Sequence, residues 1–487
     1  PPLSPAAREQ MASPKPADPD LARALAAIVG PRWVKTRGAE RRTYEADGLP
    51  THASVPMLAV LPGSKAEVIA IVRLLHQRLV AWVARGAGTG LSGGALADDE
   101  TVLIPLTRLN RILRIDPNAR RAVIEPGVVN ARLSEAAAPF GLAYAPDPSS
   151  QTACTIGGNV AENAGGPHCL KYGATTAHVA AIEVVLPDGT VTTLGSPQGE
   201  PWGPDLVGLF VGSEGMFGIA LEITVRLEPV PAAVRTLLAD FASVRAATES
   251  VGAIIAAGIV PAALELLDQA CVRAVEASIY AAGYPTDAAA VLLVELDGSR
   301  AAVDTEARMV ESFLTAAGAR TIRSAATPEA RARLWQGRKK AFGAMGRIAP
   351  DLVVQDAVVP RSALPDVLDT ITEVGRRYEL TIANVFHAGD GNLHPNICYD
   401  HRDTALRDRV HRASKEIMEA CVAAGGSITG EHGVGADKME YMPLIFDPAS
   451  LATMCAVRRA FDPAERANPR KVVPARYCRE WRPEPAR

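Results

Sequence analysis

The sequence contains no long hydrophobic run and no excess of charge, and each absence argues against a class of protein. Its longest nearly apolar run, residues 251–264, is interrupted by Gly252, Gly258 and Pro261. It is shorter than the roughly 20 residues that span a bilayer, so no transmembrane segment is predicted. The 51 basic and 54 acidic side chains leave a net charge of −3, which gives no indication of nucleic-acid binding.

The sequence also lacks clustered cysteines. Its seven cysteines lie far apart and form no CxxC pair, which argues against disulfides, a cysteine-type zinc site and an iron–sulfur cluster within the chain. An onward electron carrier would then belong to another molecule. Residues 1–19 are rich in proline and lack the apolar core of a signal peptide. We therefore expect a disordered leader and a cytoplasmic protein.

A chain of 487 residues is too long for one core, so two domains of roughly 200 residues each are expected. In the first half, the pattern around the turn at Pro62-Gly63 predicts a βαβ beginning, and Pro187-Asp188-Gly189 predicts a hairpin. Helices are expected at residues 21–28 and 66–77, and strands from Met57 and at 79–84, 101–105, 121–125, 180–186 and 191–194. The first domain is therefore predicted to be α+β.

A domain boundary is indicated near residues 227–231, where Pro229 and Pro231 end a strand-like run. The alternating patterns beyond it predict an antiparallel or mixed sheet backed by helices. Strands are expected at 236–240, 263–267, 290–296 and 351–359, and helices at 242–257, 301–317 and 363–378. The predicted organisation is a leader and helix (1–50), a first domain (51–231), a second domain (232–475) and a tail (476–487).

A glycine-rich loop at residues 85–94 follows a predicted strand. Gly88, Gly90 and Gly93 match G-x-G-x-x-G, the fingerprint of a Rossmann dinucleotide site. A Rossmann loop must open a helix, whereas Asp98-Asp99-Glu100 and a strand follow here. The glycines still let backbone amides approach an anion closely, so we interpret the loop as a phosphate cradle. The alternative is a flexible glycine-rich turn.

Two further segments are rich in glycine, asparagine and serine. One extends from Pro146 to Gly173, and the other, 212–219, ends at the start of a predicted strand. Short donors and close backbone approach suit a long polar cofactor lying across these segments.

The three segments together resemble the FAD domain of the vanillyl-alcohol oxidase family of flavoproteins. The resemblance extends over nearly the whole chain and includes the branch that contains the FAD-linked catalytic subunits of bacterial glycolate oxidases. It implies an α+β fold with a two-part FAD-binding domain and a C-terminal ferredoxin-like cap domain. The FAD contacts that it implies are Gly86, Gly88, Thr89, Gly90, Leu91, Ser92, Gly93, Gly94, Pro146, Asp147, Gly157, Gly158, Asn159, Asn163, Gly218 and Ile219. Some relatives bond FAD through a histidine, for which His168 is a candidate, but this branch usually binds FAD without such a bond.

Two histidines flank a hairpin signal in the second half. On one straight strand His387 and His394 would point to opposite faces, because seven is odd. Asp390-Gly391 predicts a two-residue turn that pairs His387 with His394 directly, about 5 Å apart at Cβ. The two imidazoles would then lie at chelating distance.

A third ligand is offered by Glu431, which precedes His432 in a glycine-flanked loop. Two histidines and a carboxylate are a common set for a catalytic divalent metal, usually zinc, manganese or iron. The alternative is a polar hairpin that binds no metal, and the Glu431-His432 loop makes the metal site the preferred interpretation.

The resemblance implies a role for each of these residues. His387, His394 and Glu431 match metal ligands, and His432 matches the general base. Asn396 matches a substrate-contacting asparagine, and Arg338 matches the arginine that binds the substrate carboxylate. Without the resemblance, Arg338 would be interpreted as a solvated helix charge.

These features predict an FAD-dependent dehydrogenase of a short 2-hydroxy acid. Relatives that take dicarboxylates carry further polar contacts where this chain has Phe342 and Val353-Val354-Gln355, so glycolate or D-lactate fits better than 2-hydroxyglutarate. We expect His432 to take the hydroxyl proton and hydride to pass to flavin N5. D-lactate or D-2-hydroxyglutarate dehydrogenase activity is the enzymatic alternative, and a structural FAD-binding subunit the non-enzymatic one.

The resemblance further implies partner subunits, one binding FAD and one carrying iron–sulfur clusters. Such partners could hold the protein at the periphery of the inner membrane.

Overall fold

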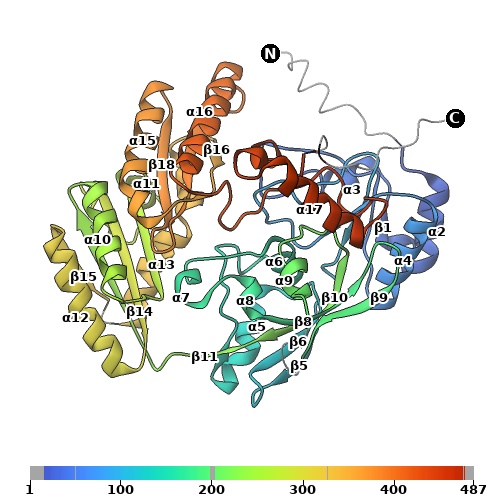
Figure 1. The fold of residues 1–487 in the computed structure, drawn as a ribbon, viewed down its shortest axis with the longest axis horizontal. Helices are drawn as coiled ribbons and strands as arrows, with labels where there is room; N and C mark the ends of the chain where they lie inside the picture. The colour runs from blue at the N-terminus through green and yellow to red at the C-terminus, as the bar shows by residue number, and fades with distance from the viewer. Residues whose placement is uncertain (1–15, 50, 198–202, 326, 475–476, 478–487) are drawn as a thin grey trace.

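The computed structural model describes residues 16–49, 51–197, 203–325, 327–474 and 477. Figure 1 shows two parts side by side, an N-terminal part and a C-terminal part built around its own sheet. Residues 1–15 of the predicted leader and all of the predicted tail except Tyr477 lie outside the described residues. The described residues include no helix with both the length and the hydropathy needed to cross a membrane.

The N-terminal part begins with a four-stranded sheet in which three strands are parallel. In sheet order these strands are β1 (Val34–Lys35), β2 (Leu58–Val60), β4 (Val102–Pro105) and β3 (Trp82–Arg85). The helices α2 (Pro19–Val29) and α4 (Lys65–Gln77) contribute to the core of this sheet. Helix α4 starts where the Ser64 hydroxyl accepts from the Glu67 amide, and it buries Val68, Ile71, Val72 and Leu75 at the spacing of one helix face.

A second, antiparallel sheet completes the N-terminal part. Its strands in order are β5 (Ile112–Asp116), β6 (Arg121–Ile124), β10 (Ile219–Arg226), β8 (Val179–Val185) and β9 (Val191–Gly195). The predicted hairpin is confirmed, because Val185 pairs with Val191 across Gly189 at φ 86°. Helices of this part include α5 (Asn130–Ala137), α6 (Ile156–Glu162), α7 (Cys169–Tyr172), α8 (Thr175–His178) and α9 (Leu206–Phe210). Strand β5 was not expected from the sequence.

The C-terminal part begins as a ferredoxin-like unit. The strands β12 (Ala233–Phe241), β13 (Ala263–Asp268), β14 (Ala290–Gly298) and β15 (Thr321–Ser324) lie in the order β15-β12-β14-β13 and are all antiparallel. The sheet continues through β18 (Thr381–His387), β19 (Asn392–Leu393) and β17 (Ala357–Val358), and β20 (Pro395–Tyr399) joins β18 to β16 (Asp351–Val354). The α+β fold with a ferredoxin-like C-terminal part is confirmed.

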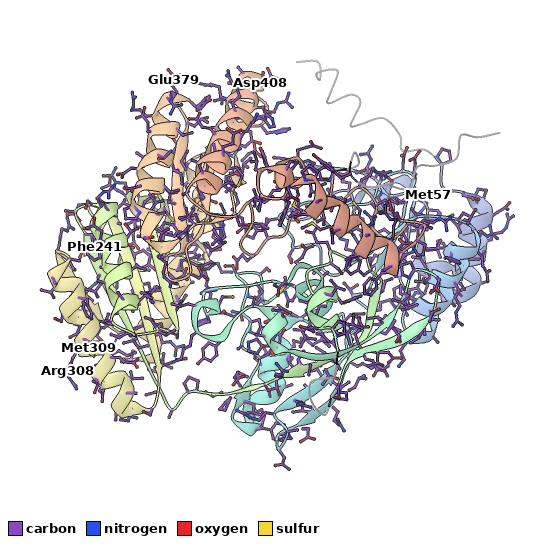
Figure 2. All side chains as sticks on the ribbon, in the orientation of Figure 1. Met57, Phe241, Arg308, Met309, Glu379 and Asp408 are labelled. Carbon is purple, nitrogen blue, oxygen red and sulfur yellow. The ribbon has the colours of Figure 1, made fainter. Side chains whose placement is uncertain are left out.

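Successive residues along each strand of this sheet face two different cores. Leu237, Leu266 and Val294 face one core, which is shared with α10 (Val244–Ala256), α12 (Arg300–Ala316), α15 (Leu364–Arg377) and α16 (Thr404–Ala423). The residues next to them face a second core on the other side, formed with α11 (Gln269–Glu276), α13 (Pro328–Lys339) and α14 (Ala341–Ala344). Phe241 lies in the first core, whereas Glu379 and Asp408 project at the outer end of the part (Figure 2). The alternation places Glu265 and Glu295 on the face that carries α13.

The final helix, α17 (Pro448–Phe461), lies against the N-terminal part (Figure 1). The Phe461 ring stacks on Phe217 with centroids 4.6 Å apart, and Ala467 bridges to Trp82 of β3. The chain therefore returns to the N-terminal part within the range predicted as the second domain.

One expectation about a strand and one about the cysteines are wrong. The single strand expected at 351–359 is two strands, β16 and β17, which break at Gln355-Asp356 because Asp356 collects the donors described below. The expectation of no disulfide fails at Cys455, which is disulfide-bonded. The described free thiols are Cys154, Cys169, Cys271, Cys398 and Cys421.

Candidate active site

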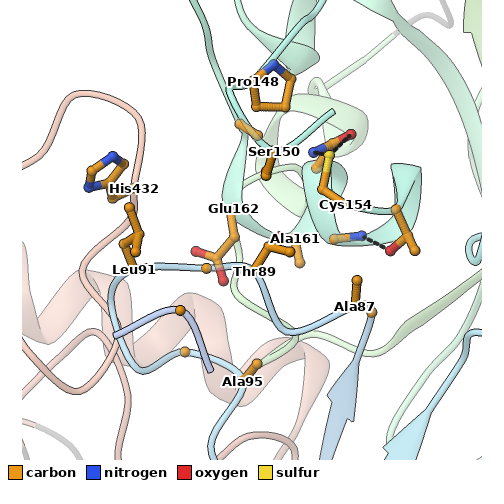
Figure 3. Close-up of a pocket in the computed structure, with 18 of the residues that line it drawn as sticks. Ala87, Thr89, Leu91, Ala95, Pro148, Ser150, Cys154, Ala161, Glu162 and His432 are labelled. Carbon is orange, nitrogen blue, oxygen red and sulfur yellow. Dashed lines mark hydrogen bonds between the residues drawn. The ribbon is translucent and has the colours of Figure 1, made fainter. Parts of the chain in front are cut away.

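One cavity of about 550 Å³ is lined by residues of both parts, the glycine segments of the N-terminal part and the histidines of the C-terminal part. Figure 3 shows His432 at its edge, with Thr89, Leu91 and Ser150 of the N-terminal segments around it. Most residues that the sequence singled out line the cavity. These are Gly86, Gly88, Thr89, Gly90, Leu91, Gly94, Gly157, Gly158, Asn159, Gly218, Ile219, Arg338, His387, His394, Glu431 and His432. Ser92, Gly93, Pro146, Asp147, Asn163 and Asn396 are not among the lining residues.

The glycine loop follows β3 and opens no helix. The Rossmann alternative is thereby excluded for this loop. A Cβ on Gly86 would lie 2.3 Å from the Thr155 hydroxyl oxygen, and Gly88, at φ 72°, has the Arg85 guanidinium where a Cβ would stand. Only glycine fits at these positions without displacing a neighbour. The loop therefore keeps its backbone open toward the cavity.

Several predicted residues that do not line the cavity are bonded to the segments that do. The Ser92 carbonyl accepts from the amides of residues 436 and 437. Asn130 donates to the Pro146 carbonyl and to Asn159. Asn163 ends α6 at φ 51°. His168, the candidate for a covalent flavin bond, does not line the cavity.

The histidine hairpin differs from the predicted register. His387 pairs with Asn392 and not with His394, so the loop has four residues, 388–391. Its turn is fixed by the Asp390 carboxylate, which accepts from the Asn392 amide. The register predicted from a two-residue turn is therefore wrong.

The two imidazoles still meet, because the shift is by two residues and preserves the face. Asn384 pairs with Pro395 in the same register, which places His394 opposite Val385, two residues from His387. Such diagonal neighbours lie within reach of each other. The ring centroids are 5.2 Å apart and the rings are nearly perpendicular.

His387, His394 and Glu431 form a compact set of ligand atoms. The Nε2 atoms of both histidines lie 3.2 Å from Glu431 Oε1, and the three ligand atoms lie within 4.8 Å of one another. Burial disfavours charge on His387, but Glu265 and Glu431 outweigh it and raise the pKa of His387 well above its usual value. The two carboxylates thus favour positive charge here, and the donor set fits a divalent cation.

Glu265 connects His387 to Arg338. It pairs with His387 across β13 and β18, accepts from His387 Nδ1 at 2.7 Å and accepts from Arg338 Nε at 2.6 Å. His387 Nε2 is thereby left to face Glu431. Arg338 is 1% exposed, lines the cavity, and its Nη1 has no hydrogen-bond partner among the residues described. The guanidinium is therefore fixed with donor capacity left for an anion.

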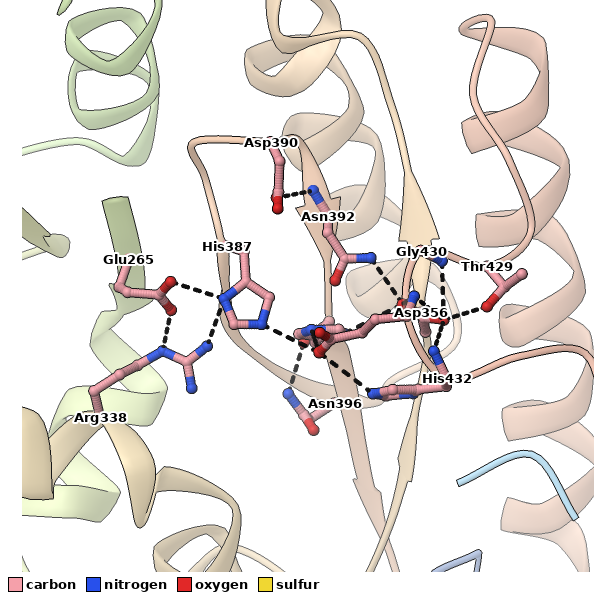
Figure 4. A network of polar contacts seen from close by, with 12 residues as sticks. Glu265, Arg338, Asp356, His387, Asp390, Asn392, Asn396, Thr429, Gly430 and His432 are labelled. Carbon is pink, nitrogen blue, oxygen red and sulfur yellow. Dashed lines mark hydrogen bonds and ion pairs between the residues drawn. The ribbon is translucent and has the colours of Figure 1, made fainter. Parts of the chain in front are cut away.

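Asp356 organises the loop that carries Glu431 and His432 (Figure 4). It is fully buried and accepts from the Thr429 hydroxyl, the amides of residues 430–432, Asn392 and Lys438. Burial disfavours the charged carboxylate, yet Lys438 and the nearby histidines outweigh that cost and hold the pKa of Asp356 well below its usual value. The loop is therefore shaped around a buried charge.

His432 stacks on His394, with centroids 4.9 Å apart and planes 3° from parallel. Its Nδ1 has no hydrogen-bond partner in the described part of the chain. Burial lowers the pKa of His432 to about 4, against the ordinary value of 6.5 assumed from the sequence. The imidazole is therefore neutral at neutral pH, the form that can accept a proton.

Glu265 and Asp356 were missed by sequence reasoning. Glu265 is the one acid in the strand predicted at 263–267, and Asp356 lies among apolar residues in the strand predicted at 351–359. A buried carboxylate in such a run indicates that it has a partner. Asn396 differs from the expectation: it is buried and donates to the carbonyls of Ala383 and His394.

The fold is also found in solved structures of other enzymes. p-Cresol methylhydroxylase with substrate bound superimposes with a TM-score of 0.82 at 17% identity, covering 95% of this chain and 99% of that chain. Alkyldihydroxyacetonephosphate synthase gives a TM-score of 0.73 at 21% identity, covering 94% and 87%. These solved structures therefore share the fold of this chain.

Sequence comparisons identify the family. Residues 56–195 match the family described as FAD binding domain, and residues 230–472 match FAD linked oxidases, C-terminal domain. The glycolate oxidase subunit GlcD of Escherichia coli (strain K12) is 49% identical over 90% of this chain and 88% of its own length. GlcD of Bacillus subtilis (strain 168) is 38% identical over 93% and 96%, and the D-lactate dehydrogenase of Anaerostipes hadrus 32% identical over 86% and 89%. The chain belongs to this family of FAD-linked oxidoreductases.

Proposed function

We propose that this protein oxidises a short 2-hydroxy acid, glycolate or D-lactate, to the 2-keto acid with FAD as the hydride acceptor. The observation that carries the proposal is the single cavity that joins the glycine segments to Arg338, His387, His394 and His432. A carboxylate-binding cation, an uncharged imidazole that can accept a proton and a metal-ligand set beside the flavin segments are what such a reaction needs. Similarity to relatives named glycolate oxidase subunit and D-lactate dehydrogenase supports it.

In this proposal His387, His394 and Glu431 hold a divalent cation, which we expect to be zinc, with manganese or iron as alternatives. The supporting observation is the buried ligand set, with His387 Nδ1 occupied by Glu265. When FAD and the cation are bound, they supply hydride acceptance and polarisation of the substrate hydroxyl.

The chain's own residues orient the substrate and move its proton. Arg338 binds the substrate carboxylate through its free Nη1 while Glu265 holds its Nε. His432 accepts the hydroxyl proton, and Asp356 keeps the His432 loop in place. Asn396 donates to the His394 carbonyl. In this proposal it acts by positioning His394 and not by substrate contact.

The FAD contacts inferred from the sequence remain part of the proposal, with Ser92, Gly93, Pro146, Asp147 and Asn163 supporting the lining loops. We also propose that residues 51–231 form the FAD-binding domain and 232–475 the substrate domain.

The choice of a short acid rests on the wall beside the metal ligands. Phe342, Leu352 and Val354 line the cavity, and the Phe342 ring centroid lies 6.4 Å from that of His394. Gln355 points elsewhere and donates to Ser414. These three side chains offer no partner for a second carboxylate, and the nearby cation Lys339, which also lines the cavity, already pairs with Asp147. A buried unpaired carboxylate is costly.

Because two relatives are named subunits of glycolate oxidase, we propose that FAD-binding and iron–sulfur partner subunits accept the electrons. The protein would then be cytoplasmic and peripheral to the inner membrane through those partners.

A substrate panel tests the proposal. Turnover of glycolate, D-lactate and D-2-hydroxyglutarate by the FAD-loaded protein is measured with an artificial electron acceptor. We expect one of the two short acids to have the highest kcat/KM. A preference for D-2-hydroxyglutarate would contradict the assignment, and absence of flavin reduction by all three acids would overturn the activity itself.

A further inference from the structure

A buried polar cluster outside the cavity joins the two parts of the molecule. His168 belongs to the N-terminal part, where it precedes α7. Its Nδ1 lies 2.9 Å from Asp147 Oδ1, and its Nε2 lies 3.4 Å from Glu295 Oε1 on β14. Its ring stacks on Trp335 of α13, with centroids 5.4 Å apart. We call His168, Asp147, Glu295 and Trp335 the interdomain clamp.

The clamp holds one face of α13. Arg331 and Trp335 both donate to Glu295, and Lys339 donates to Asp147. These three residues are spaced by four and therefore lie on one side of the helix. Arg338 stands between the last two anchors and is the residue that α13 presents to Glu265 and the cavity.

Asp147 belongs to the loop that contributes Pro148, Ser149 and Ser150 to the cavity lining. A link from this loop through His168 to Glu295 and α13 thus spans the two sides of the cavity. The contacts are largely removed from solvent: the Glu295 side chain is 2% exposed, that of Asp147 13% and that of His168 21%. Charge-assisted hydrogen bonds in such surroundings are strong and directional.

We propose that His168 is a positioning residue that fixes α13 relative to the flavin-side loop and thereby sets the angle at which Arg338 meets the substrate carboxylate. The role given to Arg338 rests on the proposed function, but the contacts that join His168 to Glu295 and α13 do not. Arg338 contacts the substrate carboxylate and not the bond that breaks, so its displacement weakens ground-state and transition-state binding alike and raises KM.

The test compares His168→Gln with Lys171→Met in the FAD-loaded full chain. Glutamine stays polar but cannot bridge both acids as an imidazolium. Lys171 makes a neighbouring interdomain contact, with Asp297, that does not touch α13, so Lys171→Met is the matched control. Amide hydrogen exchange of residues 328–340, KM and kcat for glycolate, and FAD content are measured for each variant.

We expect faster exchange in α13 and a KM for glycolate about tenfold higher in His168→Gln, the effect of losing one charge-assisted hydrogen bond. Its kcat and FAD content, and every reading of Lys171→Met, should match the unmodified protein. Unchanged exchange in α13, or an equal change in the control, overturns the inference. A fall in kcat with KM unchanged also overturns it, because His168 would then act on the reacting groups.

Two further outcomes are kept distinct. If the unmodified protein reduces no flavin with any 2-hydroxy acid, the proposed function fails, and hydrogen exchange alone decides whether the clamp holds α13. If His168→Gln does not fold, Trp335→Phe replaces it. That variant keeps a ring against His168 but removes the Nε1 donor to Glu295, and the same expectations and contradictions apply.

Discussion

At the scale of the residue, the site depends on buried side chains that are fixed by other buried side chains. Glu265 illustrates this, since one carboxylate holds both His387 and Arg338. Neither pairing could be predicted from the sequence, because Glu265 lies 122 residues from His387 and 73 from Arg338. The two histidines among the proposed metal ligands were recognisable because they flank one turn, whereas the residues that support them come from distant strands.

His432 tests the assignment of the base. We expect His432→Ala to bind FAD normally and to lose substrate-driven flavin reduction, falling by about 10²–10⁴-fold, the usual contribution of a general base. Visible flavin absorbance after anaerobic addition of glycolate measures it. Flavin reduction at the unmodified rate would remove His432 from the mechanism.

A substitution at Asp356 tests whether a buried charge holds the loop of Glu431 and His432. Asp356→Asn places an amide among the donors of residues 429–432, and we expect metal affinity to fall about 10–100-fold, as when outer-shell partners of ligands are removed. Metal content by elemental analysis measures it, with Asp366→Asn as the control, since the Asp366 side chain is 79% exposed. Equal metal affinity in both variants would contradict the account.

At the scale of the element, the hairpin of β18 and β19 shows what sequence patterns can and cannot give. Asp390-Gly391 correctly predicted a turn. The loop has four residues because its backbone also bonds the chain at the end of β17, where the Val359 amide donates to the Gly391 carbonyl. His387 and His394 still lie next to each other, because a two-residue shift leaves side chains on the same face. Most elements were likewise predicted in type, while the break of β16 from β17 depends on Asp356, whose partners are remote in sequence.

Gly391 is the position where this hairpin requires glycine. It has φ 80°, and a Cβ there would lie 2.2 Å from the Val359 carbonyl oxygen. We expect Gly391→Ala to lower the free energy of unfolding by about 1–3 kcal/mol and to reduce metal content. Denaturant unfolding measures the first effect. Gly343→Ala is the control, since nothing lies within 4 Å of a Cβ there; equal stability of the two variants would show that the turn tolerates a side chain.

At the scale of the whole molecule, the cavity exists only where the two parts meet. Sequence motifs predicted both sides of it, but nothing in them indicated how the parts are joined. The joint is formed by His168, Asp147 and Glu295 and by the return of residues 466–468 to Trp82. The contact of His168 with Glu295 and those of residues 466 and 468 with Trp82 link segments over 120 residues apart, beyond the range of periodicity or spacing.

The joint should be sensitive to pH. Burial disfavours charge on His168, but Asp147 and Glu295 outweigh it and raise the pKa of His168 from 6.5 to about 10; Arg331 and Lys339 are the other charges at the clamp. Because the folded pKa is raised, the stabilisation is complete below pH 6.5 and is lost as the pH rises toward about 10. The stability advantage of the unmodified protein over His168→Gln should shrink across that interval in denaturant unfolding. An advantage independent of pH would show that His168 is not charged in the clamp.

The central claim is that a metal-dependent 2-hydroxy acid site adjoins the flavin. Its most direct test is anaerobic single-turnover mixing of glycolate with the FAD-loaded protein, before and after removal of metal by a chelator and after metal is restored. The account predicts rapid loss of oxidised-flavin absorbance, slowed by chelation and recovered on adding Zn²⁺ or Mn²⁺, with FAD retained throughout. Flavin reduction that is equally fast in the metal-free protein would contradict it.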